Sequence, residues 1–177
     1  MPFLAAAVAL LTILCLLNLV LTFGVIRKLR LQADQRASAA ADELMLPPGS
    51  PVPDFTAVTT AGETVTRDTL GETLIGFFSP DCTACAERLP KFVELARELD
   101  GDRSVLAVVH AEKGEAAEEI AALAAVGHVV VEPQQGPMGT LFKVEGYPIF
   151  ALLPGDGPVT ATAFDLDRLP LRATSRA

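Results

Sequence analysis

Two cysteines, Cys82 and Cys85, are the residues whose type and spacing could carry chemistry. They lie in the segment FFSPDCTACAERLP, after an apolar run and at the start of a predicted helix. There the positive end of the helix dipole favours the thiolate of Cys82, the form that attacks disulfides. One turn later, Cys85 can resolve the mixed disulfide. The pair predicts thiol–disulfide exchange through a redox-active Cys82–Cys85 disulfide, with no added cofactor.

Other interpretations of the cysteine pair were compared with this one. A structural zinc site needs four ligands, and His110 and His128 are too far apart for a finger-like pattern, so no metal is expected. Haem attachment needs a histidine directly after Cys85, where Ala86 stands. Two inert buried thiols remain the third interpretation, although a strand-to-helix turn is an unusual place for them. We favour the redox pair.

A second candidate element is the sequence Gly146-Tyr147-Pro148, directly before another apolar run. Only about 5–6% of bonds before proline are cis in folded proteins. The upstream cysteine pair in a chain of alternating strands and helices nevertheless favours a cis proline facing the cysteines. The residue before such a proline can offer its backbone N–H and C=O to an extended substrate, as in strand addition. Tyr147 and Pro148 are therefore predicted to bind substrate.

The elements that must position these residues alternate between apolar strands and helices. LIGFFS (74–79) is a continuous apolar run, typical of a strand buried on both faces. Apolar residues at helical spacing follow it up to residue 99. The later elements are expected as strand 104–110, helix 115–125, strand 128–132, a short helix near 138–143, a strand within 146–153 and its hairpin partner 159–164. Two short strands joined at Ala61 and Gly62 precede them all. This order predicts an α/β fold with a mixed central sheet flanked by helices.

The N-terminal part of the chain carries a separate signal. Residues 3–26 form a 24-residue stretch without a charge. At about 1.5 Å per residue it exceeds the ~30 Å hydrocarbon core of a bilayer, which predicts one transmembrane helix. A cleavable signal peptide would carry basic residues before the apolar stretch, and none is present there. Residues 27–46 are expected to form a stalk, and four prolines between Pro47 and Pro53 indicate that the folded domain spans 47–177.

The charge pattern excludes one class of partner and bears on membrane orientation. The formal net charge is −8 at pH 7, which offers no footing for nucleic acid. No basic residue precedes the apolar stretch. Four follow it, namely Arg27, Lys28, Arg30 and Arg36. The positive-inside rule would then place the folded domain in the cytoplasm.

Several motifs together resemble a known family. They are PVPDF, TTAGETVT, LIGFFSPDCTAC, Pro90 in the first helix, and GYPIF, within residues 47 to about 164. They are similar to the membrane-anchored thioredoxin-like thiol-disulfide reductases of the TlpA and ResA type. The anchor with its basic residues, ELM before the prolines, and the SPxC sequence add a similarity to the methylamine dehydrogenase accessory (MauD) group.

This resemblance implies a thioredoxin-like fold of the redoxin type. It implies that Cys82 is the nucleophile, Cys85 the resolving cysteine and Pro148 a cis proline. It also implies a client protein with cysteines or a disulfide, and an upstream electron donor that the chain does not specify. Relatives of this type act outside the cytoplasmic membrane of bacteria, so we expect the outward orientation, against the charge rule.

The sequence departs from the family pattern near the cysteines. Asp81 stands where relatives carry an aromatic residue, and Gly76 stands where thioredoxin has a buried acid. Arg88 replaces the glutamate of the ResA group, with Glu87 beside it. Asp81, Glu87 and Arg88 are thus possible modulators, and the proton acceptor for Cys85 is unassigned. Because Asp81 opposes ionisation of Cys82, we expect a reductant or exchanger rather than a primary oxidant.

Two rival functions are compatible with the same fold. A thiol peroxidase would carry a PxxxTxxC pattern. With Cys85 as its cysteine, Phe78 stands in place of the proline and Cys82 in place of the threonine. A copper-binding or delivery module would use both thiols and a histidine, for which His128 is the candidate.

Overall fold

The computed structural model describes residues 40–99, 103–112 and 114–171, together with residues 11, 14–19, 21–23, 25, 26 and 28. The chain divides into two compact units, Met1–Ala37 and Ser38–Ala177. In the first unit the described residues are helical and exposed. The rest of the predicted transmembrane helix 3–26 lies outside the described residues. Among the residues that are described, none of the helices has both the length and the apolar character needed to span a bilayer.

A five-stranded mixed sheet with the order β5-β4-β3-β6-β7 forms the centre of the second unit. The strands are β3 (Thr73–Phe78), β4 (Ser104–His110), β5 (His128–Glu132), β6 (Ile149–Leu153) and β7 (Ala161–Ala163). Strands β3, β4 and β5 are parallel to one another, β6 runs antiparallel to β3, and β7 runs antiparallel to β6. All six residues of the central strand β3 are buried, as its unbroken apolar run predicts. A separate hairpin of β1 (Thr56–Val58) and β2 (Thr64–Thr66) completes the strands of the described residues.

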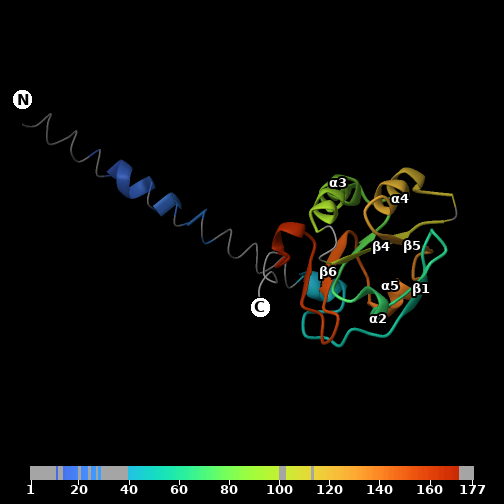
Figure 1. Ribbon diagram of the computed structural model, residues 1–177. Coiled ribbons are helices and arrows are strands. Elements are labelled where there is room, and N and C mark those ends of the chain that lie inside the picture. The colour runs from blue at the N-terminus through green and yellow to red at the C-terminus, as the bar shows by residue number, and fades with distance from the viewer. Residues whose placement is uncertain are drawn as a thin grey trace, which may run out of the picture. The chain divides into compact units, whose positions relative to one another are not determined.

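Helices cover both faces of the sheet, as expected from the alternating pattern (Figure 1). On one face lie α3 (Thr83–Glu98) and α4 (Ala117–Ala124). On the other lie α5 (Pro137–Leu141), α2 (Arg67–Leu70) and the β1–β2 hairpin. Because successive side chains of a strand point to opposite faces, Phe77 enters the core beneath α5 whereas Phe78 enters the core beneath α3.

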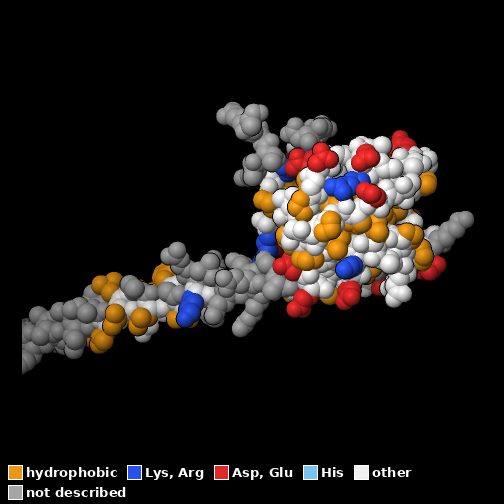
Figure 2. Space-filling view, turned by 90° about the horizontal axis from the view of Figure 1, so that it is seen from below, with side chains coloured by type: hydrophobic (Ala, Val, Ile, Leu, Met, Phe, Trp, Pro, Cys, Tyr) orange, Lys and Arg blue, Asp and Glu red, His pale blue; other side chains and the backbone are white. Residues whose placement is uncertain are grey.

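The surface of the second unit agrees with the net negative charge of the chain. Figure 2 shows apolar side chains in the middle of one face and acidic side chains around its margin. The basic side chains on this face are scattered rather than clustered. On this face the basic side chains form no stripe of the kind that a nucleic acid backbone contacts.

Residues 40–46 belong to the second unit, although the sequence pattern suggested a stalk up to residue 46. Residues 40–44 are helical, and Met45 and Leu46 are 2% and 8% exposed. The Leu46 N–H also donates a hydrogen bond of 3.0 Å to the Phe142 carbonyl. The prolines from residue 47 onward stop the local helix, but they do not show that the preceding turn packs into the core.

Removing residues 1–46 is expected to destabilise this unit, whereas removing residues 1–37 is not. Burying a Met or Leu side chain contributes roughly 1.5–3 kcal/mol, so losing Met45 and Leu46 should lower the free energy of unfolding by about 3–6 kcal/mol. Urea unfolding of the two shortened chains, followed by circular dichroism, measures the difference. Equal midpoints would contradict the packing described for residues 40–46.

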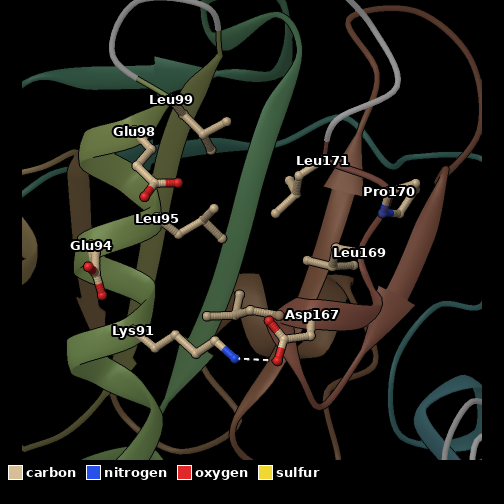
Figure 3. A pocket seen from close by; sticks show the side chains of 10 residues that line it. Lys91, Glu94, Leu95, Glu98, Leu99, Asp167, Leu169, Pro170 and Leu171 are labelled. Carbon is tan, nitrogen blue, oxygen red and sulfur yellow. Dashed lines mark hydrogen bonds and ion pairs between the residues drawn. The ribbon is translucent and has the colours of Figure 1, made fainter.

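A groove of about 890 Å³ lies between α3 and the C-terminal segment (Figure 3). Leucines line it from both sides: Leu95, Leu99, Leu166, Leu169 and Leu171. An ion pair between Lys91 and Asp167 crosses one end. Within the described residues this segment forms only the 3₁₀ helix η1 (Leu166–Arg168), and Pro170 follows it. The groove is not the redox site, because neither Cys82 nor Cys85 lines it.

Candidate redox site

The central strand β3 ends at Phe78, and the three-residue turn 79–81 then places Cys82 at the N-terminus of α3. Cys82 is the N-cap residue of this helix and has an extended backbone conformation. Its Sγ accepts a hydrogen bond of 3.2 Å from the Cys85 N–H. The spacing of three residues is what brings this N–H to the sulfur, because an N-cap side chain reaches the third residue of its helix. A helix N–H therefore faces the sulfur on which negative charge develops during exchange.

The second cysteine is in a different environment. Cys85 is 3% exposed, whereas Cys82 is half-buried, and both thiols are free. The pKa of Cys85 is raised from 9.0 to about 12, chiefly by burial and in part by the hydrogen bond and charge of Cys82. A backbone hydrogen bond from Ser79 and the charge of Arg88 lower it. At neutral pH Cys85 therefore keeps its proton and cannot compete with Cys82 as the attacking thiol.

A small hollow lies beside Cys85. Its volume is about 20 Å³, which is the space of a single water molecule. Apart from Cys85 it is lined mainly by apolar atoms, including those of Phe78, Leu89 and Val109. This lining explains why burial is the largest contribution to the raised pKa of Cys85.

The loop before β6 supplies the third part of the site. The Tyr147–Pro148 peptide bond is cis. The Cys82 thiol donates a hydrogen bond of 3.3 Å to the Tyr147 carbonyl. Burial raises the pKa of the Tyr147 phenol, and the charges of Glu132 and Cys85 raise it further. The end of β3, the start of α3 and the Tyr147–Pro148 loop thus meet at Cys82, although they lie far apart in the sequence.

The structure places the three possible modulators differently. Asp81 and Glu87 are exposed at the start of α3. Arg88 is half-buried, and its charge lowers the pKa of Cys85. Pro90 lies inside α3, in the helix where the family pattern has it. Of the three modulators, Arg88 is therefore the one with a described electrostatic effect on a site thiol.

Gly76 has a steric reason to be a glycine. A β-carbon at this position would lie 2.9 Å from ring atoms of both Phe78 and Phe92, and 3.1 Å from Phe150. Real β-carbons essentially never approach another atom closer than 3.0 Å. Aromatic rings therefore fill the space in which the family resemblance implies a buried acid. No side chain at position 76 can accept the proton of Cys85.

Two buried polar residues near the site were not singled out by sequence reasoning. The sequence pattern presents His110 only as a possible metal ligand and gives no role to Glu132. They end the neighbouring parallel strands β4 and β5, and they pair in register. The signal in the sequence was a polar residue at the end of each of two apolar runs, SVLAVVH and HVVVE. Parallel strands end at the same sheet edge, and this is the edge from which β3 leads to Cys82.

Metal-based alternatives find no support in the geometry. Within residues 40–99, 103–112 and 114–171 and the described helical residues before them, no three His, Cys, Asp or Glu side chains cluster so as to hold a metal ion. His128 begins β5 opposite Leu106, at the other end of the strands from Cys82. Its Nδ1 lies 3.4 Å from Glu63 Oε2. The histidine required by the copper-binding alternative is therefore not at the cysteine pair.

Comparisons with known proteins agree on the fold. No protein-family model and no curated protein matches the sequence. Among solved structures, one assigned as a thiol:disulfide interchange protein DsbE from Chlorobium tepidum matches with a TM-score of 0.57 and 24% identity, over 67% of this chain and 85% of that one. The chain has a thioredoxin-like fold.

Two further structures with the thioredoxin-like fold match over similar lengths. The exposed lipoprotein thioredoxin Etrx1 of Streptococcus pneumoniae has a TM-score of 0.50 and 26% identity, over 62% of this chain and 87% of that one. A secreted disulfide oxidoreductase of Mycobacterium tuberculosis, homologous to E. coli DsbE, has a TM-score of 0.54 and 18% identity, over 63% and 83%. The matched part of the chain thus accounts for most of each of these proteins.

Proposed function

We propose that this chain is a membrane-tethered thiol-disulfide oxidoreductase that reduces or exchanges disulfides of a client protein. The observation that carries the proposal is the position of Cys82. Its sulfur lies at the N-terminus of α3, in contact with the Cys85 N–H on one side and with the Tyr147 carbonyl on the other. The thioredoxin-like fold, shared with proteins described as disulfide oxidoreductases, supports this function.

The reaction proceeds in two exchange steps. The Cys82 thiolate attacks one sulfur of the client disulfide, forms a mixed disulfide with it, and releases the other client sulfur as a thiolate. Cys85 then loses its proton and attacks the Cys82 sulfur, which releases the second client thiol and leaves a Cys82–Cys85 disulfide. Two electrons pass from the cysteine pair to the client, and an upstream dithiol donor must return them.

The contact between Cys82 and Tyr147 connects chemistry with client binding. In the reduced protein the Cys82 thiol occupies the Tyr147 carbonyl as a hydrogen-bond donor. When Cys82 loses its proton to attack, this carbonyl becomes free to accept an N–H from an extended client segment. The acceptor is thus released at the moment when the client arrives beside the sulfur.

The proposed direction of electron transfer, from the cysteine pair to the client, rests on how few groups stabilise the thiolate form of the reduced pair. A strong oxidant requires a heavily stabilised reduced form. Thr83 and Ala84 between the cysteines supply no positive charge that would stabilise a thiolate. The first basic residue of α3 is Arg88, which lies beyond the first turn. Cys85 is held protonated by burial. We therefore assign the chain to disulfide reduction or exchange.

Replacing Cys85 with Ser is expected to trap a mixed disulfide between Cys82 and the client. The first exchange step remains possible, whereas the resolving step lacks its thiol. Non-reducing gel electrophoresis of cells that carry C85S should show a new covalent adduct that dithiothreitol removes. The double variant C82S/C85S is the matched control and should form none. An adduct that persists in the double variant, or the absence of any adduct in C85S, would count against the proposed exchange reaction.

The membrane tether and its orientation are part of the proposal. The charge-free stretch 3–26 supports a single-pass anchor in the cytoplasmic membrane of a bacterium. Two proteins of this fold, the exposed lipoprotein Etrx1 and the secreted oxidoreductase of Mycobacterium tuberculosis, support an outward domain, and the basic residues after the stretch argue for an inward one. We propose the outward orientation. A membrane-impermeant maleimide should then label Cys82 in intact cells, and labelling only after lysis would reverse the orientation.

A further inference from the structure

His110 and Glu132 form a buried pair behind the loop that carries Tyr147 and Pro148. They are 2% and 6% exposed, and His110 Nε2 lies 3.5 Å from Glu132 Oε1. The carboxylate of Glu132 also accepts two hydrogen bonds from the first turn of α5, one of 2.9 Å from the Met138 N–H and one of 2.7 Å from the Gly139 N–H. Glu132 therefore holds both His110 and the beginning of α5, the helix whose chain leads on to Tyr147.

The His110 ring packs against the ring of Tyr147. Their centroids are 5.0 Å apart with an interplanar angle of 45°. Neither ring nitrogen of His110 forms a hydrogen bond of ordinary geometry, although both are buried, so the 3.5 Å approach of Glu132 Oε1 to Nε2 is an electrostatic contact. An unpaired buried polar group costs roughly 1–3 kcal/mol, so a phenylalanine would suit this core position better on stability alone. Buried polar groups that lack a hydrogen bond are expected mainly at functional sites.

Two glycines show how closely α5 approaches this pair. A β-carbon on Gly139 would lie 2.5 Å from His110 Cε1, and one on Gly136 would lie 2.5 Å from Glu132 Cδ. Any side chain at either position would have to displace the pair or move the helix. The sequence GPMG therefore fits a helix start that rests directly on His110 and Glu132.

Residues 44–46 hold the other side of the same loop. The Glu145 N–H donates a hydrogen bond of 2.9 Å to the Leu44 carbonyl, and the Leu46 N–H donates one of 3.0 Å to the Phe142 carbonyl. The backbone before Tyr147 is thus held at both ends of the segment 142–145. Beyond this segment, the ring of Tyr147 packs against His110.

We propose that His110 and Glu132 are positioning residues for client binding. The imidazole holds the Tyr147 ring, Glu132 orients the imidazole and anchors α5, and together they place the Tyr147 carbonyl beside Cys82. This inference rests on the proposed reductase function. Loss of the His110–Glu132 pair should weaken the binding of a protein client, which needs the Tyr147 loop, and should leave unchanged the reduction of a small disulfide, which needs only the cysteines Cys82 and Cys85.

The chain offers a direct probe of this arrangement. Tyr147 is its only tyrosine, and it has no tryptophan. The intrinsic fluorescence of the full chain in detergent micelles therefore reports on the Tyr147 ring alone. His110→Ala removes the packing partner and should lower the anisotropy of this emission. His110→Phe retains a ring and should keep the anisotropy nearer the wild-type value.

Kinetics test whether the placement matters for clients. With dithiothreitol as donor, His110→Ala should raise the KM for insulin about tenfold, since a small misplacement of a binding group has effects of this size or larger. The rate with 2-hydroxyethyl disulfide should not change. Glu132→Gln replaces one acceptor of the α5 N–H groups by a donor and should act in the same direction. His128→Phe, at the other end of the strands, is the matched control and should behave as wild type.

The outcomes separate the two hypotheses. If the wild-type chain does not reduce insulin, the proposed function fails. If it does, and neither His110→Ala nor Glu132→Gln changes the insulin KM or the tyrosine anisotropy, only the positioning role is overturned. An equal loss with both substrates would also overturn it, because that indicates general damage. Should His110→Ala not fold, His110→Phe and Glu132→Gln give the same decision.

Discussion

At neutral pH, iodoacetamide is expected to alkylate Cys85 about a thousand times more slowly in the folded, reduced chain than in the urea-unfolded chain, and more slowly than the half-buried Cys82. Alkylation requires the thiolate, and the pKa of Cys85 is raised from 9.0 to about 12, chiefly by burial. A rise of three units lowers the thiolate fraction at neutral pH roughly a thousandfold. Because the raised pKa means that the proton is held to higher pH, modification of Cys85 should appear only as the pH increases towards 12. Mass spectrometry of the alkylated peptides over a pH series measures both rates.

Two controls make this experiment specific. Cys15→Ala removes the third thiol, and unfolding in urea should bring the two remaining rates together, since burial is then lost. Arg88→Gln tests the electrostatic contribution, because the charge of Arg88 lowers the pKa of Cys85. In that variant the onset of Cys85 modification should move to still higher pH. Similar rates for Cys82 and Cys85 in the folded chain at neutral pH would contradict the environment described for Cys85.

Phe92→Ala is expected to lower the free energy of unfolding by about 3–5 kcal/mol, the usual cost of removing a buried phenylalanine. Phe92 is fully buried on the sheet side of α3. Its ring stacks on Phe150 with centroids 5.6 Å apart and meets Phe78 edge-on at 5.2 Å. A domain is usually stable by only about 5–15 kcal/mol, so this single change removes a large share. Urea unfolding followed by circular dichroism measures the loss.

Two further substitutions serve as comparisons for Phe92→Ala. Phe92→Leu retains part of the side-chain volume and should cost clearly less. Val58→Ala changes a residue of β1 that is 61% exposed and should stay within about 0.5 kcal/mol of wild type. If Phe92→Ala proved as stable as Val58→Ala, the aromatic cluster around Gly76 would not hold α3 on the sheet as described.

The local features of the fold could be predicted from the sequence. SVLAVVH and HVVVE are strands with the bounds that their apolar runs indicate, and LIGFFS differs from β3 by one residue at each end. Hydrophobic runs bounded by turn residues depend only on neighbours in the chain, which is why they are readable. The position of Cys82 at a strand-to-helix turn is equally local. The short helix α2 was not predicted, because four residues carry too little periodicity to recognise.

The extent of the folded unit and the surroundings of the cysteines could not be predicted in this way. Met45 and Leu46 looked like part of a stalk because the groups that bury them, among them Phe142, lie almost a hundred residues later. The reason for Gly76 is the rings of Phe92 and Phe150, which come from α3 and β6. None of these contacts leaves a periodic pattern near either partner.

The amino-acid sequence by itself determined the strands, the helix start at Cys82 and the spacing of the cysteine pair, since each follows from propensities and periodicity within a few residues. Only the tertiary structure decided which groups surround that pair. The pairing of His110 with Glu132 depends on the register of β4 against β5, and the contact of Tyr147 with Cys82 depends on how β6 returns beside β3. Strand register and chain return are set by packing of the whole core, so the partners of Cys82 and Cys85 became visible only in the folded molecule.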